Sequence, residues 1–155
     1  MIRWLALAAL ITVLDQLSKS AVVHALVYGA SVEITPFFNL VLVYNSGAAF
    51  SLLANAGGWQ HYLFVAIAGI AVVWVIYLIY KYPRHTLLCF GLALILGGAI
   101  GNLIDRLMLG SVVDFLDFHA AGHHWPAFNV ADSGITCGAL LLVWESLRGK
   151  PLTPA

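Results

Sequence analysis

Charged residues are scarce in this sequence, and neither sign is in excess. Only 9% of the 155 residues are Asp, Glu, Lys or Arg, seven basic against seven acidic, whereas about a quarter of the residues of a soluble domain are charged. The hydrophobic share of 62% and the mean hydropathy of +0.95 exclude an ordinary soluble globule. The balanced charge provides no basic surface for phosphates, so nucleic acid is not an expected partner.

Cysteine is also scarce. Cys89 and Cys137 each lie inside an apolar run. We therefore expect buried free thiols instead of a disulfide or a metal site, and the two residues do not indicate a cellular compartment.

Long apolar runs dominate what is present. A membrane-spanning helix needs about 20 mostly apolar residues, and residues 62–80, 86–104 and 129–147 meet this length. The segment 2–23 is interrupted by Asp15 and Lys19, so a cleaved signal peptide is the alternative there. The two charges share one helical face, which favours a retained span. The sequence therefore predicts a single all-α integral-membrane domain over residues 1–155, with four transmembrane helices.

The basic residues predict the orientation of these spans. By the positive-inside rule both termini lie in the cytoplasm, because five basic residues fall on one side (Arg3, Lys81, Arg84, Arg148 and Lys150) and two on the other (Lys19 and Arg106). Segments 28–60 and 105–128 then face outward. Residues 32–44 are rich in β-branched and aromatic side chains, which indicates a strand or hairpin at the membrane surface or over the helix ends.

Polar residues gather at the outer ends of the expected helices and in the outer segments. They are Asp15, Lys19, Asn45, Asn102, Asp105, Arg106, Asp114, Asp117, Asn129 and Asp132. Charges near hydrocarbon are costly, so this cluster predicts a polar site inside the bundle. No serine nucleophile elbow or His-Glu-x-x-His motif is present. The chemistry that remains is acid–base catalysis by two aspartates that share a proton. Spacing does not choose the pair, although Asp132 is the most costly to keep inside a span.

Other features have structural interpretations. We expect Asp105 and Asp117 to be solvated or locally paired. Gly97, Gly98 and Gly101 indicate close helix packing. The segment 118–126 contains Gly and Pro and is expected to be a loop, so its histidines do not supply a defined metal site. These histidines are His119, His123 and His124. Tryptophans near the span ends are expected to be interfacial anchors, namely Trp4, Trp59, Trp125 and Trp144.

Five sequence blocks resemble the lipoprotein signal peptidases, or signal peptidase II, which are aspartyl proteases of the bacterial inner membrane. The blocks are Asp15-Gln-x-Ser-Lys19, Asn45-Ser-Gly-Ala-Ala-Phe-Ser51, Gly97-Gly-Ala-Ile-Gly-Asn-Leu-Ile-Asp-Arg106, Val112-Val-Asp-Phe115 and Phe128-Asn-Val-Ala-Asp-Ser133. They follow the order of the family along a matching four-span layout. This resemblance implies a catalytic dyad of Asp114 and Asp132.

The resemblance also implies supporting or substrate-binding roles for Asn45, Asn102, Arg106 and Asn129. For Asp15 and Lys19, substrate contact and a structural ion pair remain equally open. The implied substrate is a prolipoprotein with a diacylglyceryl group on its cysteine, cut just before that cysteine. No metal or cofactor is implied. The expected partners are this substrate and the lipid bilayer, the chain is expected to be a monomer, and the active site is expected near the periplasmic face. The Gly-containing segment 45–50 is expected to close over bound substrate.

Two other function classes are weighed against this one. A small proton-coupled transporter would also use an intramembrane carboxylate. However, no inverted repeat is visible, and the acidic residues gather at one face instead of at the midplane. A non-catalytic assembly subunit would explain the hydrophobicity but not five matched polar blocks.

Overall fold

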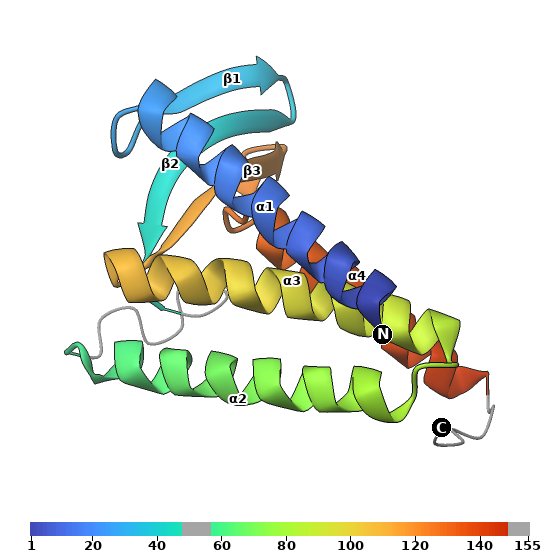
Figure 1. Ribbon diagram of the computed structural model, residues 1–155. Helices are drawn as coiled ribbons and strands as arrows, with labels where there is room; N and C mark the ends of the chain where they lie inside the picture. Colours follow the sequence, from blue (N-terminus) through green and yellow to red (C-terminus); the bar gives the residue numbers. More distant parts are fainter. Residues whose placement is uncertain (48–56, 149–155) are drawn as a thin grey trace.

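The computed structural model describes residues 1–47 and 57–148, and within them the chain forms four long helices and a small sheet (Figure 1). The helices are α1 (Ile2–Ala25), α2 (Trp59–Lys81), α3 (Thr86–Leu109) and α4 (Val130–Leu147). Each is long and apolar enough to cross a membrane. The predicted fold class, four spanning helices with a β-containing segment after the first helix, is confirmed.

Helix α3 differs most from its predicted bounds. It was expected to end at residue 104, but it continues to Leu109, where Gly110 ends it with a left-handed φ of 75°. The predicted span ended directly before the charged residues Asp105 and Arg106. Both side chains instead find partners inside the protein, so the helix passes through them.

Helix α3 is the centre of the bundle and packs against each of the other three helices. In Figure 1 it lies between α1 and α2. Glycine makes this packing possible, because a Cβ at Gly98 would lie 2.3 Å from the Ala131 oxygen and one at Gly97 would lie 2.6 Å from the Ala8 oxygen. The close helix approach predicted from these glycines is confirmed.

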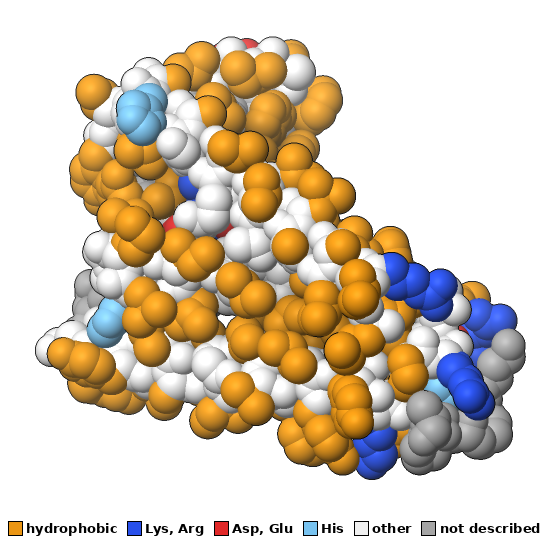
Figure 2. Space-filling view, viewed as in Figure 1, with side chains coloured by type: hydrophobic (Ala, Val, Ile, Leu, Met, Phe, Trp, Pro, Cys, Tyr) orange, Lys and Arg blue, Asp and Glu red, His pale blue; other side chains and the backbone are white. Residues whose placement is uncertain are grey.

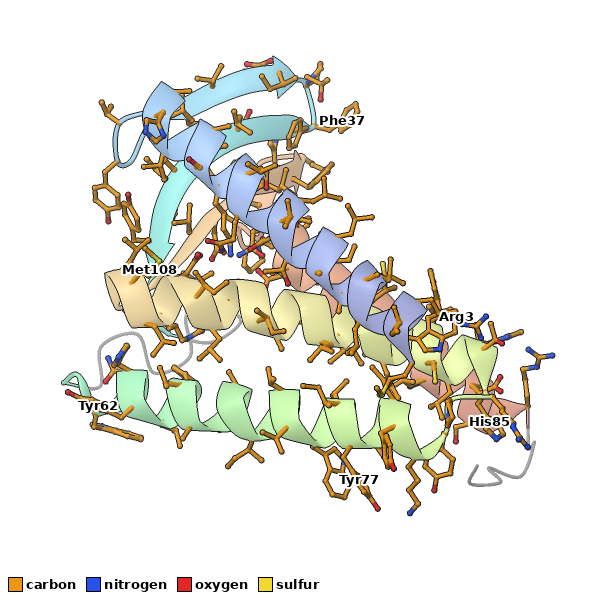
Figure 3. The ribbon with its side chains drawn as sticks, viewed as in Figure 1. Arg3, Phe37, Tyr62, Tyr77, His85 and Met108 are labelled. Atoms are coloured by element: carbon orange, nitrogen blue, oxygen red, sulfur yellow. The ribbon has the colours of Figure 1, made fainter. Side chains whose placement is uncertain are left out.

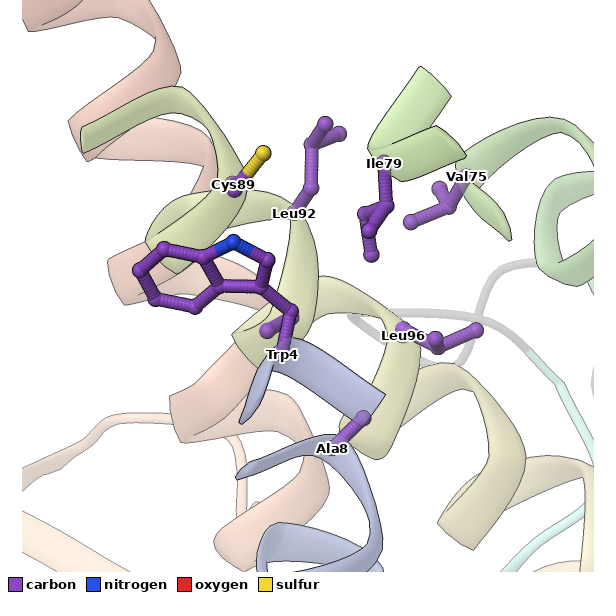
Figure 4. Packing of buried hydrophobic residues seen from close by; sticks show 8 residues of the cluster. Trp4, Ala8, Val75, Ile79, Cys89, Leu92 and Leu96 are labelled. Carbon is purple, nitrogen blue, oxygen red and sulfur yellow. The ribbon is translucent and has the colours of Figure 1, made fainter. Parts of the chain in front are cut away.

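A hydrophobic cluster joins α1, α2 and α3 away from the sheet (Figure 4). Trp4 packs there beside Cys89 and Leu92, with Val75 and Ile79 contributed by α2. Trp4 was expected to be an interfacial anchor, but its side chain is only 6% exposed and so packs inside the protein instead of facing the membrane interface. Trp59, Trp125 and Trp144 are exposed. The buried indole fills the space between the start of α1 and the start of α3.

The sheet is antiparallel, with the strand order β1-β2-β3-β4. Its strands are β1 (Ser31–Thr35), β2 (Phe38–Asn45), β3 (Val112–Ala120) and β4 (His123–His124). The hairpin predicted within 32–44 is confirmed. The loop predicted for 118–126 is wrong in part, because residues 118–120 continue β3, and His119 and Ala120 pair with β4. Ala121 and Gly122 both adopt positive φ, as a tight two-residue hairpin turn requires.

The sheet is held against the end of α1 by a second hydrophobic cluster of Val22, Leu42, Val113 and Phe115. This contact places β2 and β3 next to the ends of α1 and α3. We call this end of the bundle the sheet end.

The opposite end carries most of the basic residues. Arg3 begins α1, Lys81 ends α2, Arg84 precedes α3 and Arg148 follows α4, so all four lie at one end. Figure 2 shows Lys and Arg side chains gathered there, with hydrophobic side chains over most of the remaining face. In Figure 3, Arg3 and His85 mark this basic end, and Phe37, Tyr62 and Met108 mark the sheet end. Lys150 lies outside the described residues.

Candidate active site

A cavity of about 690 Å³ opens at the sheet end. It is lined by β2, α3, β3, the segment 125–128 and α4. Its polar lining comes from residues far apart in the sequence, including Asn45, Asn102, Arg106, Asp114 and Asp132. Its apolar lining includes Val43, Phe128 and Ile135. The cavity therefore combines a polar group with an apolar wall, an arrangement typical of small-molecule and peptide sites.

The alternation of β3 places Asp114 in this cavity. Side chains of a strand point alternately to opposite faces. Val113 and Phe115 pack into the cluster under α1, so Val112 and Asp114 face the cavity. The register between β2 and β3 shifts between Leu40 and Val43. Such an irregularity re-aims side chains beside a site. Asp114 is buried, with 3% of its surface exposed.

The first turn of α4 places Asp132. Asn129 is the N-cap residue, and its Oδ1 accepts a hydrogen bond of 2.9 Å from the backbone N–H of Asp132. A capping bond of this kind satisfies one of the N–H groups that a helix start leaves unpaired. The carboxylate in the first turn also interacts favourably with the helix dipole. The start of α4 is therefore fixed by the residue that contacts both aspartates.

Three asparagines hold the two carboxylates. Asn129 donates to Oδ1 of Asp114 at 2.8 Å, and Asn45 donates to Oδ2 of the same residue at 3.1 Å. Asn102 donates to Oδ1 of Asp132 at 2.8 Å. The structure thus brings together five residues singled out in the sequence. Because all three amides donate, they stabilise negative charge on the aspartates.

The electrostatics of the site favour a proton on Asp114. Burial, together with the neighbouring charge of Asp132, raises the pKa of Asp114 from 3.8 to about 7. The hydrogen bonds from Asn45 and Asn129 and the charge of Lys19 act in the opposite direction and do not cancel this rise. At neutral pH the site can therefore hold one proton next to an ionised carboxylate, which is the state needed for acid–base catalysis.

Lys19 and Asp15 lie behind the cavity and not in its lining. Lys19 Nζ is 2.8 Å from Asp15 Oδ2 and 2.8 Å from Asp105 Oδ2. It also donates to Oδ1 of Asn102 at 2.9 Å. The ion pair between Asp15 and Lys19 is therefore present, and it extends to α3.

Arg106 connects the cavity to α2 and to the end of β2. Its Nη2 donates to the Gly47 oxygen at 3.0 Å, and its guanidinium carbon lies 5.2 Å from the centre of the Phe64 ring. A cation above an aromatic face is attracted by the ring. Arg106 therefore supplies a positive charge at the cavity wall. Residues 48–50 of the segment expected to close over the substrate lie outside the described residues.

Asp105 and Asp117 were expected to be solvated or locally paired, and the structure shows them buried and paired, Asp105 with Lys19 and Asp117 with Asn39 and His124. One expectation needs correction. Cys137 is exposed instead of buried, because it lies on the face of α4 that lines the cavity. Within the described residues, no group of three His, Cys, Asp or Glu side chains could hold a metal ion.

Sequence reasoning did not place Gln16 or Asp105 in this network. Gln16 Nε2 donates to Asp105 Oδ1 at 2.9 Å and lies 3.2 Å from Asp15 Oδ2. A signal was available, because Asn102 and Asp105 share a helical face and are expected at the same depth as Asp15 and Lys19. Two polar faces at one level of neighbouring helices indicate a contact between them.

Comparisons with known proteins agree with this geometry. Residues 7–148 match the family described as signal peptidase (SPase) II. A lipoprotein signal peptidase of Paraburkholderia phymatum is 57% identical over 145 residues, which cover 94% of this chain and 87% of the relative. One from Janthinobacterium sp. is 53% identical over 148 residues, which cover 96% of this chain and 90% of the relative.

Solved structures are also similar. One bacterial membrane enzyme superposes with a TM-score of 0.86 at 30% identity, over 96% of this chain and 89% of the other. A second gives a TM-score of 0.84 at 30% identity, over 97% of this chain and 96% of the other. The likeness therefore extends over the four helices and the sheet together.

Proposed function

The chain belongs to the signal peptidase II family, and we propose that Asp114 and Asp132 are its catalytic dyad. The protein is an aspartic endopeptidase that removes signal peptides from prolipoproteins in the membrane. The observation that carries the dyad is geometric. The two carboxylates line one cavity, and Asn129 contacts both residues, through its amide to Asp114 and through its oxygen to the backbone of Asp132.

The reaction follows from one proton held between the two aspartates. The ionised carboxylate takes a proton from a water, which attacks the carbonyl carbon of the scissile peptide. The protonated carboxyl donates a hydrogen bond to the carbonyl oxygen as negative charge develops there. The tetrahedral intermediate collapses as the leaving amine receives a proton, and the peptide C–N bond breaks. Two carboxylates supply all these steps, so the proposal includes no metal or cofactor.

The supporting residues act on the dyad and on the substrate backbone. Asn45, Asn102 and Asn129 donate hydrogen bonds to the carboxylates. Arg106 provides a positive charge at the cavity wall, suited to a peptide carbonyl or a developing negative charge. Asp15 and Lys19 belong to the supporting group and not to the substrate-binding group, since neither lines the cavity.

We extend the proposal to the substrate. It is a prolipoprotein with a diacylglyceryl group on its cysteine, and the bond cut lies just before that cysteine. The mixed lining of the cavity supports this. Asp114 and Asp132 lie at its polar part, while Val43, Phe128 and Ile135 offer apolar surface for the flanking segment or its lipid.

We also propose a location in the bacterial inner membrane, with both termini in the cytoplasm and the site near the periplasmic face. The basic end of the bundle supports this orientation, since cytoplasmic ends carry the excess of Lys and Arg. Asp15 and Lys19 of α1 contact α3 and α4, which supports a retained first helix within a single domain. We further propose that the chain acts as a monomer.

The test is cleavage by the purified chain in detergent or bilayers. A diacylglyceryl-modified prolipoprotein is compared with the same protein without lipid, with the Asp132→Asn variant, and with a chelator present. We expect cleavage of the lipidated substrate alone, lost in the variant and unaffected by the chelator. Equal cleavage by the variant contradicts the dyad, and sensitivity to the chelator contradicts the metal-free reaction. The relatives are lipoprotein signal peptidases and give no support to a transporter.

A further inference from the structure

We propose that Lys19 is a positioning residue that holds both catalytic aspartates in register through a buried brace. The brace consists of Lys19, Asp15 and Asp105, and it lies behind the cavity wall. This proposal rests on the assignment of Asp114 and Asp132 as the dyad.

The ammonium of Lys19 is fully engaged inside the protein. Lysine offers three N–H donors and no acceptor. Here Nζ lies 2.8 Å from Asp15, 2.8 Å from Asp105 and 2.9 Å from Asn102, and 3% of the residue is exposed. No donor remains for a substrate. A buried ammonium that loses even one such partner is strongly destabilised, so the contacts with Asp105 and Asn102 fix the relative positions of α1 and α3.

The two carboxylates of the brace each hold the backbone beside a catalytic residue. Asp15 Oδ1 accepts a hydrogen bond of 2.8 Å from the N–H of Ala131, the residue directly before Asp132. Asp105 Oδ2 accepts a hydrogen bond of 3.0 Å from the N–H of Val113, the residue directly before Asp114. One cation thus sets the spacing of two carboxylates, and these carboxylates set the spacing of the two backbones that carry the dyad.

The third contact of Lys19 orients a side chain of the site. The Asn102 oxygen faces the ammonium, so its amide nitrogen faces Asp132 and donates at 2.8 Å. Turning the carboxamide over would set its N–H groups against the ammonium and its oxygen against a carboxylate. Both new contacts are repulsive. Lys19 therefore determines that Asp132 receives a donor instead of an acceptor.

Gln16 also contacts both carboxylates of the brace. Its amide nitrogen contacts Asp105 at 2.9 Å, Asp15 at 3.2 Å and the Gly101 oxygen at 3.1 Å. Both carboxylates are therefore held by donors other than Lys19. This permits a charge-balanced test, because a double variant without Lys19 and Asp105 charges keeps Asp15 anchored to α4 by Ala131.

The test compares Lys19→Met and the double variant Lys19→Met with Asp105→Asn against the natural chain. The double variant removes one positive and one negative charge together, so it leaves one buried carboxylate, Asp15, without its cation, whereas the single variant leaves two. We expect kcat for the lipidated substrate to fall about 100-fold in both, the loss that a misplacement of about 1 Å produces. We expect KM to stay unchanged, because Lys19 does not line the cavity.

The pH profile separates positioning from a purely structural role. Removing the Lys19 cation should move the alkaline limb of kcat to higher pH, because its charge lowers the pKa of Asp114. Thr12→Val is the matched control, since Thr12 lies on α1 and, among the described residues, its hydroxyl donates to the Ala8 and Gly97 oxygens. Thr12→Val should lower the unfolding temperature, but the alkaline limb of its kcat–pH profile should stay at the same pH as in the natural chain.

The outcomes distinguish this proposal from the dyad itself. A folded double variant with natural kcat and an unshifted pH profile overturns the brace while Asp132→Asn remains inactive. Activity in Asp132→Asn instead overturns the dyad. A rise in KM with kcat unchanged would assign Lys19 to substrate binding and also contradict the brace.

Discussion

Gly101 lies so close to Asp15 that a Cβ on the glycine would be 2.5 Å from the Oδ2 atom of the carboxylate. This is the same oxygen that pairs with Lys19. The absence of a side chain at one position of α3 is therefore what lets a charged residue of α1 reach the start of α4. The packing of α1 on α3 and the ion pair of Asp15 with Lys19 therefore both depend on the space left free at Gly101.

We predict that Gly101→Ala lowers both stability and activity. Overpacking of a close contact costs about 1–3 kcal/mol, and here the displaced group is Asp15, which holds the backbone before Asp132. The free energy of unfolding should fall by this amount, and kcat should fall more than Gly-to-Ala substitutions elsewhere in the bundle cause. Unfolding in detergent and single-turnover cleavage measure the two effects.

Gly69→Ala is the control for that substitution. Gly69 lies in α2, and a Cβ there meets no atom within 4 Å. Alanine favours a helix over glycine by about 1 kcal/mol, so this variant should be as stable as the natural chain or more so, with full activity. Natural kcat in Gly101→Ala would contradict the role of the Gly101–Asp15 contact.

Replacing either member of the dyad should abolish cleavage and leave the fold intact. Asp114→Asn and Asp132→Asn keep the size of the side chain but cannot exchange a proton with water or with the leaving amine. Loss of acid–base catalysis costs about 10²–10⁴-fold in rate. Initial rates with lipidated substrate, together with thermal unfolding of the same preparations, test this expectation.

Asp117→Asn is the matched control for the dyad variants, because Asp117 lies on the same strand and outside the cavity lining. It should cleave at the natural rate. A dyad variant as active as Asp117→Asn would rule out that aspartate as a catalytic group.

The pH dependence of activity should report the proton on Asp114. Burial and the charge of Asp132 raise the pKa of Asp114 to about 7, so the dyad loses its proton, and kcat declines, as the pH rises through about 7. Asn45→Ala removes a hydrogen bond that lowers this pKa. The decline of kcat with rising pH should therefore occur at higher pH in this variant than in the natural chain. A limb that stays in place, or moves to lower pH, would contradict the role of Asn45.

The same raised pKa has a consequence for stability. Because the folded chain disfavours the ionised form of Asp114, the free energy of unfolding should decline as the pH rises from about 3.8 to about 7 and then level off. Asp114→Asn should remove this decline. Chemical unfolding at a series of pH values measures it, and an identical slope in the variant would show that another group is responsible.

The sequence predicted the spans well because the cost of placing polar groups in hydrocarbon is a local property of the chain. It also predicted the polar face of Asp15 and Lys19, since residues four apart share a helical face. It did not predict the second partner of Lys19, which is Asp105. Asp105 follows at a distance of more than 80 residues, and only the packing of α1 on α3 brings the two together. Contacts of this kind depend on glycines such as Gly97 and Gly101, because the missing side chain lets α1 and α3 approach each other closely.

Strand β3 was harder to predict than β2 for a related reason. In β2, β-branched and aromatic residues mark a strand. In β3, Asp114 and Asp117 interrupt the apolar pattern, and the turn at Ala121 and Gly122 resembled a loop. The site itself required the family resemblance, because spacing alone left the pairing of five aspartates open. Functional sites are where a residue is expected to depart from the pattern of the helix or strand that carries it, as Asp114 does in β3.

The contact between Asp117 and His124 should stabilise the hairpin of β3 and β4 without affecting catalysis. Burial raises the pKa of Asp117, but the hydrogen bonds from His124 and Asn39 outweigh it and hold the pKa below its ordinary value of 3.8. A lowered pKa stabilises the fold above about pH 3.8 and loses that contribution as the pH falls through the folded value. His124→Ala should therefore lower the unfolding free energy by up to about 1 kcal/mol at pH 7, and by less at pH 3. His123→Ala, at an exposed neighbouring position, serves as the control. Equal destabilisation by His124→Ala at both pH values would mean that the imidazole stabilises the hairpin by packing on His119 and not through Asp117.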